Sequence, residues 1–194
     1  MTKSPRAQKR EVLKLVEDPV HAGDGTEAAR PALATVESFE DFYRREFPGL
    51  LVLARALAGD LAAEDVAQES MVVTYRDWPR ISVMRSPVGY VRGICTHKAL
   101  SATRRHLAER RAVRRAASRV EADFGQMPDH SDRFWAEVRQ LPSRQAQAVA
   151  LYYALDLPIA EVAATLGCAE GTVKAHLFHA RTLLASRLGP REEK

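Results

Sequence analysis

The residues best suited to chemistry lie near the C-terminus, between residues 170 and 184. Apolar residues recur there at helical spacing and predict one buried stripe: Val173, Leu177, Ala180 and Leu184. The positions off this stripe are mostly polar or basic: Thr172, Lys174, Ala175, His176, Phe178, His179 and Arg181. Hydroxyl, imidazole, ammonium and guanidinium groups on an exposed helix are suited to gripping phosphates and reading base edges in a DNA groove.

A short helix is expected just before this one. Pro158 opens it, Gly167 ends it, and Ile159, Val162 and Leu166 form its apolar stripe. Two short helices separated by a glycine-containing turn predict a helix-turn-helix. Many helical hairpins share this pattern, so by itself it favours DNA binding and leaves a purely structural hairpin open.

A second polar set lies on a helix expected over residues 60–77. Asp65, Gln68 and Glu69 are three and four residues apart and share one face, opposite the apolar side that contains Val66. Such a face either binds a partner or is simply solvated.

A basic helix is expected after a loop over residues 76–85. Ser86 followed by Pro87 combines an N-cap with proline at the first helical position, and the helix should reach about His106. The tract 109–119 is strongly basic and could prolong it. Trp78, in the preceding loop, is more typical of a core residue than of a stacking platform.

These elements must be positioned by a helical scaffold. The chain has 194 residues with 46% hydrophobic content, and helical periodicity runs almost throughout without an alternating strand. We expect an all-α fold of two small helical domains joined by a flexible linker. The expected units are a disordered arm (1–36), a first domain (37–108), a basic linker (109–130), a second domain (131–189) and a tail (190–194).

Charge and composition narrow the function. The net charge is +4 and the pI near 9.3, with basic residues clustered from Lys98 to Arg119, which suits a polyanionic partner. No apolar run approaches the ~18 residues needed to span a bilayer. Cys95 and Cys168 lack paired or metal-type spacing, which favours a reducing cytoplasm.

Catalytic and metal chemistry are not expected. The sequence shows no nucleophile with a placed base, phosphate-cradling glycine loop or paired catalytic carboxylates. His176, His179 and Cys168 are close in sequence, but a fourth zinc ligand is missing. We therefore predict a non-enzymatic protein with no catalytic residue, metal or cofactor.

Two stretches carry a family resemblance. The sequence from Leu141 to Tyr153, followed by Pro158 to Lys174, resembles sigma region 4. Independently, Ala63 to Ser70, followed by Tyr90 to Cys95 and the basic helix, resembles sigma region 2. Over about residues 39–189 the chain thus resembles the extracytoplasmic-function (ECF) type of sigma-70 family RNA polymerase sigma factors.

The resemblance implies a cytoplasmic, polymerase-bound initiation subunit. Region 2 would bind the core enzyme and recognise and melt the minus-10 element, and region 4 would recognise the minus-35 element. The implied partners are bacterial core polymerase, through its largest-subunit clamp helices and its flap, promoter DNA and an anti-sigma factor, with no membrane insertion. The residues implied for core binding are Asp65, Gln68 and Glu69.

The resemblance also implies two DNA sites. The residues expected at minus-10 DNA are Arg76, Arg80, Ser82, Met84, Arg85, Arg92, Thr96, His97, Lys98, Ser101, Arg104 and Arg105. The residues expected at minus-35 DNA are Thr172, Lys174, Ala175, His176, His179 and Arg181. The sequence departs from the family at both sites, with His97 and Ser101 in place of Asn and Asp, and Ala169 where a capping residue often stands.

Two other readings remain open. A helix-turn-helix regulator that binds DNA without polymerase would leave the first domain unexplained. A protein that sequesters polymerase or an anti-sigma factor without reading promoters would fit the unusual Ala169, His176 and His179.

Overall fold

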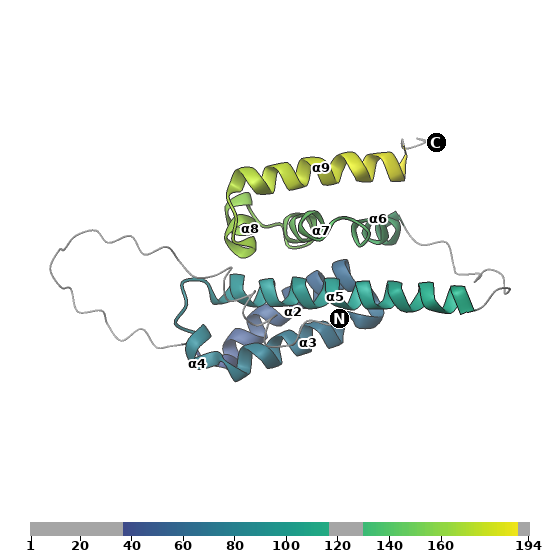
Figure 1. Ribbon diagram of the computed structural model, residues 1–194. Helices are drawn as coiled ribbons and strands as arrows, with labels where there is room; N and C mark the ends of the chain where they lie inside the picture. Colours follow the sequence, from purple (N-terminus) through teal and green to yellow (C-terminus); the bar gives the residue numbers. More distant parts are fainter. Residues whose placement is uncertain (1–36, 117–129, 190–194) are drawn as a thin grey trace, which may run out of the picture.

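The computed structural model describes residues 37–116 and 130–189. The predicted arm (1–36), the tail and most of the predicted linker lie outside these residues. Every regular element in the described ranges is a helix (Figure 1), which confirms the predicted all-α class. No helix in these ranges has the length and apolar character needed to cross a bilayer.

Between residues 37 and 116 the structure has four helices: α2 (Phe39–Ala58), α3 (Asp60–Arg76), α4 (Trp78–Ile81) and α5 (Pro87–Ala116). Ser38 caps α2 by accepting a hydrogen bond from the Asp41 amide at 3.1 Å. Pro48 lies inside α2 without ending it. Ser86 caps α5 as predicted, because its hydroxyl accepts the Gly89 amide at 3.1 Å.

Three boundaries differ from the sequence-based expectation. Gly59, with φ of 82°, occupies the N-cap of α3, and Asp60 is its first helical residue and no cap. The segment predicted as a loop contains the short helix α4. The basic tract extends α5 to Ala116, so the first residues assigned to the linker are helical.

The C-terminal half also consists of helices: α6 (His130–Val138), α7 (Ser143–Val149), the π-helical turn η1 (Ala150–Ala154), α8 (Ile159–Leu166) and α9 (Glu170–Leu188). Helix α7 continues directly into η1. Gly167 adopts the left-handed conformation, with φ of 63° and ψ of 43°, and ends α8. This geometry favours glycine because it has no Cβ.

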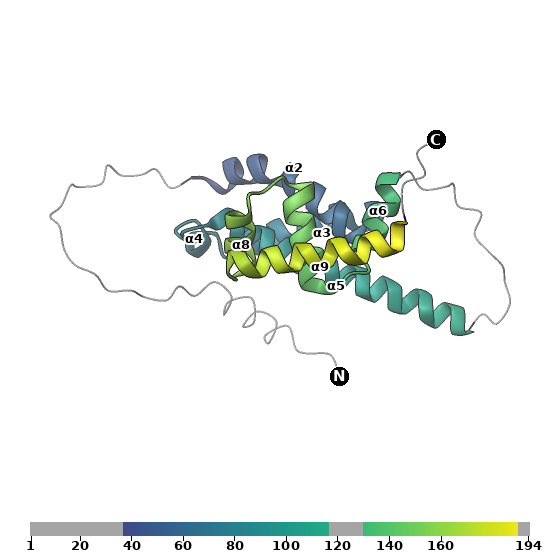
Figure 2. The same cartoon turned by 90° about the horizontal axis from the view of Figure 1, so that it is seen from above.

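The long helix α5 runs through the middle of the molecule. Helices α2 and α3 pack along one side of α5, and α6 to α9 form a layer on the other (Figure 1). The C-terminal end of α5 projects beyond the bundle in both views (Figures 1 and 2). One continuous core contains Phe42 and Leu57 of the first half and Leu151 and Leu177 of the second. The two predicted domains are therefore packed against each other.

Candidate nucleic-acid interface

The acidic face of α3 forms as predicted. Asp65, Gln68 and Glu69 are exposed, whereas Val66 on the other side is buried. The Glu69 carboxylate accepts a hydrogen bond from the Lys98 ammonium at 2.7 Å. Glu69, which is expected to bind core polymerase, is thus paired with Lys98, which is expected to bind DNA.

A groove of about 840 Å³ runs between α3 and α5. Its lining includes seven residues that the sequence assigned to the two sites: Asp65, Glu69, Arg76, His97, Lys98, Ser101 and Arg105. The α3 wall carries the carboxylates of Asp65 and Glu69, and the α5 wall carries the cations of Lys98 and Arg105. Residues of the two predicted sites therefore line one groove and can influence each other electrostatically.

The segment between α3 and α5 is anchored by a small apolar cluster. Ile81, Tyr90 and Ile94 are buried together, and Met84 packs against them. The Arg80 guanidinium lies 6.0 Å from the centre of the Tyr90 ring and donates to its hydroxyl at 3.4 Å. Arg76 and Arg85 are exposed and Ser82 is half-buried, so polar groups remain accessible beside a fixed apolar wall.

Trp78 is a core residue, as the sequence favoured. Its ring lies 4.8 Å from that of Phe42 and 5.5 Å from that of Phe39, measured between centroids. It therefore joins α4 to α2.

The residues predicted on α5 point to different surroundings. Arg104 and Arg105 are exposed, and His97, Lys98 and Ser101 are half-buried. Arg92 and Thr96 instead face the C-terminal half. Thr96 is only 1% exposed, and its hydroxyl accepts a hydrogen bond from the Gln147 amide at 3.3 Å. Packing by α7 thus covers a residue that the sequence placed at DNA.

Helices α8 and α9 form the predicted helix-turn-helix. The stripe of α9 that begins at Val173 is buried, as predicted. Thr172, Lys174, Ala175, His179 and Arg181 are exposed, and His176 is half-buried. The Arg181 guanidinium donates to the Tyr153 hydroxyl at 2.8 Å, which ties the outer face of α9 to η1.

Burial, together with the nearby Arg144 and His179, lowers the pKa of His176 below its usual value. This imidazole is therefore neutral near pH 7 and is a hydrogen-bonding group more than a cation. Among the described residues, no group of three or more His, Cys, Asp or Glu side chains is arranged to hold a metal ion.

Phe178 is an exposed aromatic residue of α9 that the predicted DNA site omits. Its side chain is 66% exposed, and its ring lies 5.6 Å from that of His179. The signal available in the sequence was an aromatic residue off the buried stripe. An exposed phenyl ring on such a helix can contact thymine methyl groups.

The comparisons with known proteins agree with this geometry. The family model described as sigma-70, region 4 matches residues 131–184. An RNA polymerase sigma-E factor of Streptomyces avermitilis is 29% identical over 169 residues, covering 81% of this chain and 88% of the relative. The sigma-E factor of Streptomyces coelicolor is 27% identical over 163 residues, covering 82% and 91%. Residues 131–184 are thus similar to sigma-70 region 4, and most of the chain is similar to the two sigma-E factors.

Two solved structures share the fold of this chain. The sigma factor RpoE of Bartonella quintana, in complex with the anti-sigma factor NepR, has a TM-score of 0.56 at 20% identity, covering 77% of this chain and 96% of that one. CnrH, in complex with the cytosolic domain of CnrY, has a TM-score of 0.54 at 19% identity, covering 77% and 86%. The ECF-type resemblance inferred from the sequence is thereby confirmed.

Helix α9, the second helix of the helix-turn-helix, begins without a side-chain cap. Ala169 occupies the N-cap of α9 in an extended conformation, and its side chain offers no acceptor. Glu170 in the first turn partly compensates, because a carboxylate is favourable at the positive end of a helix.

Proposed function

We propose that this sigma factor binds core RNA polymerase and directs initiation at promoters with a minus-10 and a minus-35 element. The observation that carries the proposal is the helix-turn-helix of region 4, whose α9 buries one stripe and exposes a polar and basic face. As a sigma factor the chain is a regulatory subunit, and we assign the chemistry to the polymerase. Its place of action would be the cytoplasm, where bacterial polymerase works.

Each proposed contact has its own structural support. The exposed α3 face with Asp65, Gln68 and Glu69 would bind the clamp helices of the largest subunit, and region 4 would bind the flap. The α4 segment and α5, which we assign to region 2, would hold minus-10 DNA, because Arg80 and Met84 flank a fixed apolar wall suited to an unstacked base. Lys174, His179 and Phe178 on α9 would read the minus-35 duplex.

Regulation by a protein partner is part of the proposal. Of the solved structures, RpoE is bound to the anti-sigma factor NepR. An anti-sigma factor of that class is a candidate partner for this chain.

Reconstitution tests the proposed function. The purified chain is mixed with bacterial core polymerase and genomic DNA, and the 5′ ends of the transcripts are sequenced. We expect start sites that align on two spaced elements and are absent with core polymerase alone. Stable DNA binding without such transcripts would favour an ordinary helix-turn-helix regulator, and polymerase binding without them would favour a sequestering protein.

A further inference from the structure

Tyr153 of η1 and Arg181 of α9 contact each other across 28 positions of sequence. The Arg181 Nε–H group donates to the Tyr153 hydroxyl at 2.8 Å, and the guanidinium lies 5.8 Å from the centre of the tyrosine ring. Both residues are exposed, Tyr153 by 45%, and α9 lies on the outer side of the C-terminal layer (Figure 1). The contact therefore fixes a guanidinium where an external ligand can reach it.

The Tyr153 ring is itself held in place. Its neighbour Tyr152 packs against the hydrophobic core, and the two rings meet edge to face with their centroids 4.9 Å apart. Both tyrosines belong to the π-helical turn η1, and such turns occur frequently at functional sites. Tyr153 is thus a fixed support for Arg181.

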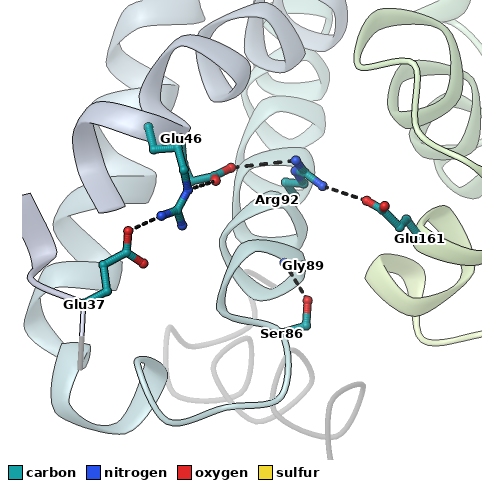
Figure 3. Close-up of polar contacts among 7 residues, drawn as sticks. Glu37, Glu46, Ser86, Gly89, Arg92 and Glu161 are labelled. Atoms are coloured by element: carbon teal, nitrogen blue, oxygen red, sulfur yellow. Dashed lines mark hydrogen bonds and ion pairs between the residues drawn. The ribbon is translucent and has the colours of Figure 1, made fainter. Parts of the chain in front are cut away.

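The charge of Arg181 is not neutralised by a carboxylate of the described chain. Arg92 shows the opposite arrangement, because its guanidinium lies 3.7 Å from Glu46 and 3.5 Å from Glu161 (Figure 3). In residues 37–116 and 130–189, Arg181 has no acidic partner, and its side chain donates to a neutral hydroxyl. Its positive charge therefore remains available to an external anion.

Hydrogen-bond donors come together at this pair. Because Nε donates to the tyrosine, the two terminal nitrogens of Arg181 keep their N–H groups for another acceptor. The Tyr153 hydroxyl accepts from Arg181 and can still donate its own proton. Guanidinium groups bind phosphate oxygens in pairs, and tyrosine hydroxyls also bind DNA phosphates. The pair therefore has the donors and the charge of a phosphate site.

The place of Arg181 on α9 favours a backbone contact over base recognition. Recognition helices contact base edges with residues near their N-terminus. Arg181 comes eleven residues after Glu170, the first residue of α9. This separation is about 16 Å along the helix axis, whereas the major groove is about 12 Å wide. A side chain at this distance lies near the edge of the groove, where the phosphates are.

We propose that Tyr153 and Arg181 form a phosphate clamp, which binds the DNA backbone at the edge of the minus-35 duplex without recognising its sequence. Tyr153 is a positioning residue for Arg181 and the second donor of the clamp. The inference rests on the proposed function, which brings α9 to that duplex, and it deepens it. It separates Arg181 from Lys174 and His179, which would read bases.

Duplex binding at several salt concentrations tests the clamp. The full-length chain is titrated against a fluorescent duplex of arbitrary sequence, roughly 30 base pairs long, at about 50 to 200 mM NaCl, because a phosphate contact needs no promoter. Arg181→Gln should weaken binding at least about threefold and reduce the slope of log affinity against log salt by about 0.9, the value of one phosphate contact.

Tyr153→Phe should also weaken binding at least about threefold, because it removes the hydroxyl that holds Arg181 and donates to the phosphate. The same substitution should have a much smaller effect when Arg181→Gln is already present, since the two residues act as a unit. An equal effect of Tyr153→Phe in both backgrounds would overturn the clamp.

Two substitutions are matched controls. Tyr152→Phe removes the neighbouring hydroxyl, and Arg187→Gln makes the same charge change on the same helix, at an arginine that lies 3.4 Å from the Glu137 carboxylate. Both should leave the salt slope near the parent value. A Tyr153→Phe protein that binds like Tyr152→Phe, or an Arg181→Gln protein with the slope of Arg187→Gln, would contradict the proposal.

A second readout locates the phosphate in the complex with polymerase. Neutral methylphosphonates are placed one at a time along the minus-35 backbone of a mapped promoter. At one position the replacement should weaken binding by the parent holoenzyme and leave binding by the Arg181→Gln holoenzyme unchanged, and the lack of such a position would overturn the clamp. Failure of the proposed function is seen separately, as a lack of aligned transcript starts, because the duplex titration uses neither polymerase nor promoter.

Discussion

His176 shows how the surroundings of a single residue of α9 change its pKa. Its pKa is lowered from 6.5 by burial, by Arg144 and by His179, so the folded chain holds this proton less tightly than the unfolded chain. The neutral imidazole thus contributes stability that is fully present well above pH 6.5 and is lost as the pH falls through the lowered folded pKa.

We therefore expect His176→Gln to flatten the acid side of the stability profile. The free energy of unfolding, measured by urea denaturation at about pH 7.5 and 5.5, should fall less in the variant than in the parent chain. An equal or larger fall in the variant would contradict the pKa assigned to His176.

At the scale of the element, a capping side chain added at the uncapped N-terminus of α9 should stabilise the chain. Ala169 already has the extended conformation of an N-cap, with φ of −71° and ψ of 151°. Ala169→Ser should therefore stabilise the chain by about 1 kcal/mol, because the hydroxyl can accept an orphan amide of the first turn. Urea denaturation measures the change, and Ala169→Val, which offers no acceptor, is the control. A serine variant no more stable than the valine variant would show that the amides have another partner.

Alanine substitutions at the two glycines that flank the N-terminus of α9 should change the stability of the chain in opposite directions. Gly167 has positive φ, so Gly167→Ala should destabilise the chain by about 1 to 2 kcal/mol. Gly171 is helical and exposed, with nothing within 4 Å of an added Cβ, so Gly171→Ala should stabilise by up to about 1 kcal/mol. Thermal denaturation of both variants checks the pair, and shifts of the same sign would contradict the turn geometry.

Local sequence signals predicted most of these elements well. The Ser86 cap, the end of α8 at Gly167 and the buried stripe of α9 depend on neighbouring residues, and each forms as expected. Helix α4 lies in the segment predicted as a loop, and its Pro79 is tolerated there because it stands in the first turn. Periodicity also did not distinguish α7 from the π-helical η1.

The surroundings of the candidate site could not be predicted in the same way. Arg92 meets Glu161 across 69 positions of sequence, and Thr96 meets Gln147 across 51. Such pairs depend on how α7 and α8 pack against α5, which helical spacing does not encode. The acidic face of α3 needed no such packing, and it was predicted from spacing alone.

At the scale of the whole molecule, the acidic face should govern binding to core polymerase. Asp65→Arg with Glu69→Lys should weaken binding at least about tenfold, equivalent to ~1.4 kcal/mol, by reversing charge at exposed positions. Asp65→Arg alone is informative because it keeps the ion pair between Glu69 and Lys98.

The control for this charge reversal is Glu40→Lys on α2. It makes the same charge change as Asp65→Arg and loses only an exposed pair with Arg44, of little energetic value. Pull-down with core polymerase and circular dichroism are the measurements. A folded double variant that binds like the Glu40→Lys control would remove α3 from the polymerase interface.

The central claim is that one chain recognises a promoter at two sites, as intact duplex at minus-35 and as unstacked bases at minus-10. Abortive transcription on duplex and pre-opened bubble templates tests this claim most directly. Lys174→Ala on α9 should cost roughly 1 to 3 kcal/mol through a lost contact with intact duplex, and a bubble at minus-10 should not restore activity. Arg80→Ala with Arg85→Ala should impair a step coupled to melting, and the bubble should relieve that part of the defect. Rescue of the α9 variant by the bubble, without rescue of the arginine variant, would contradict the account.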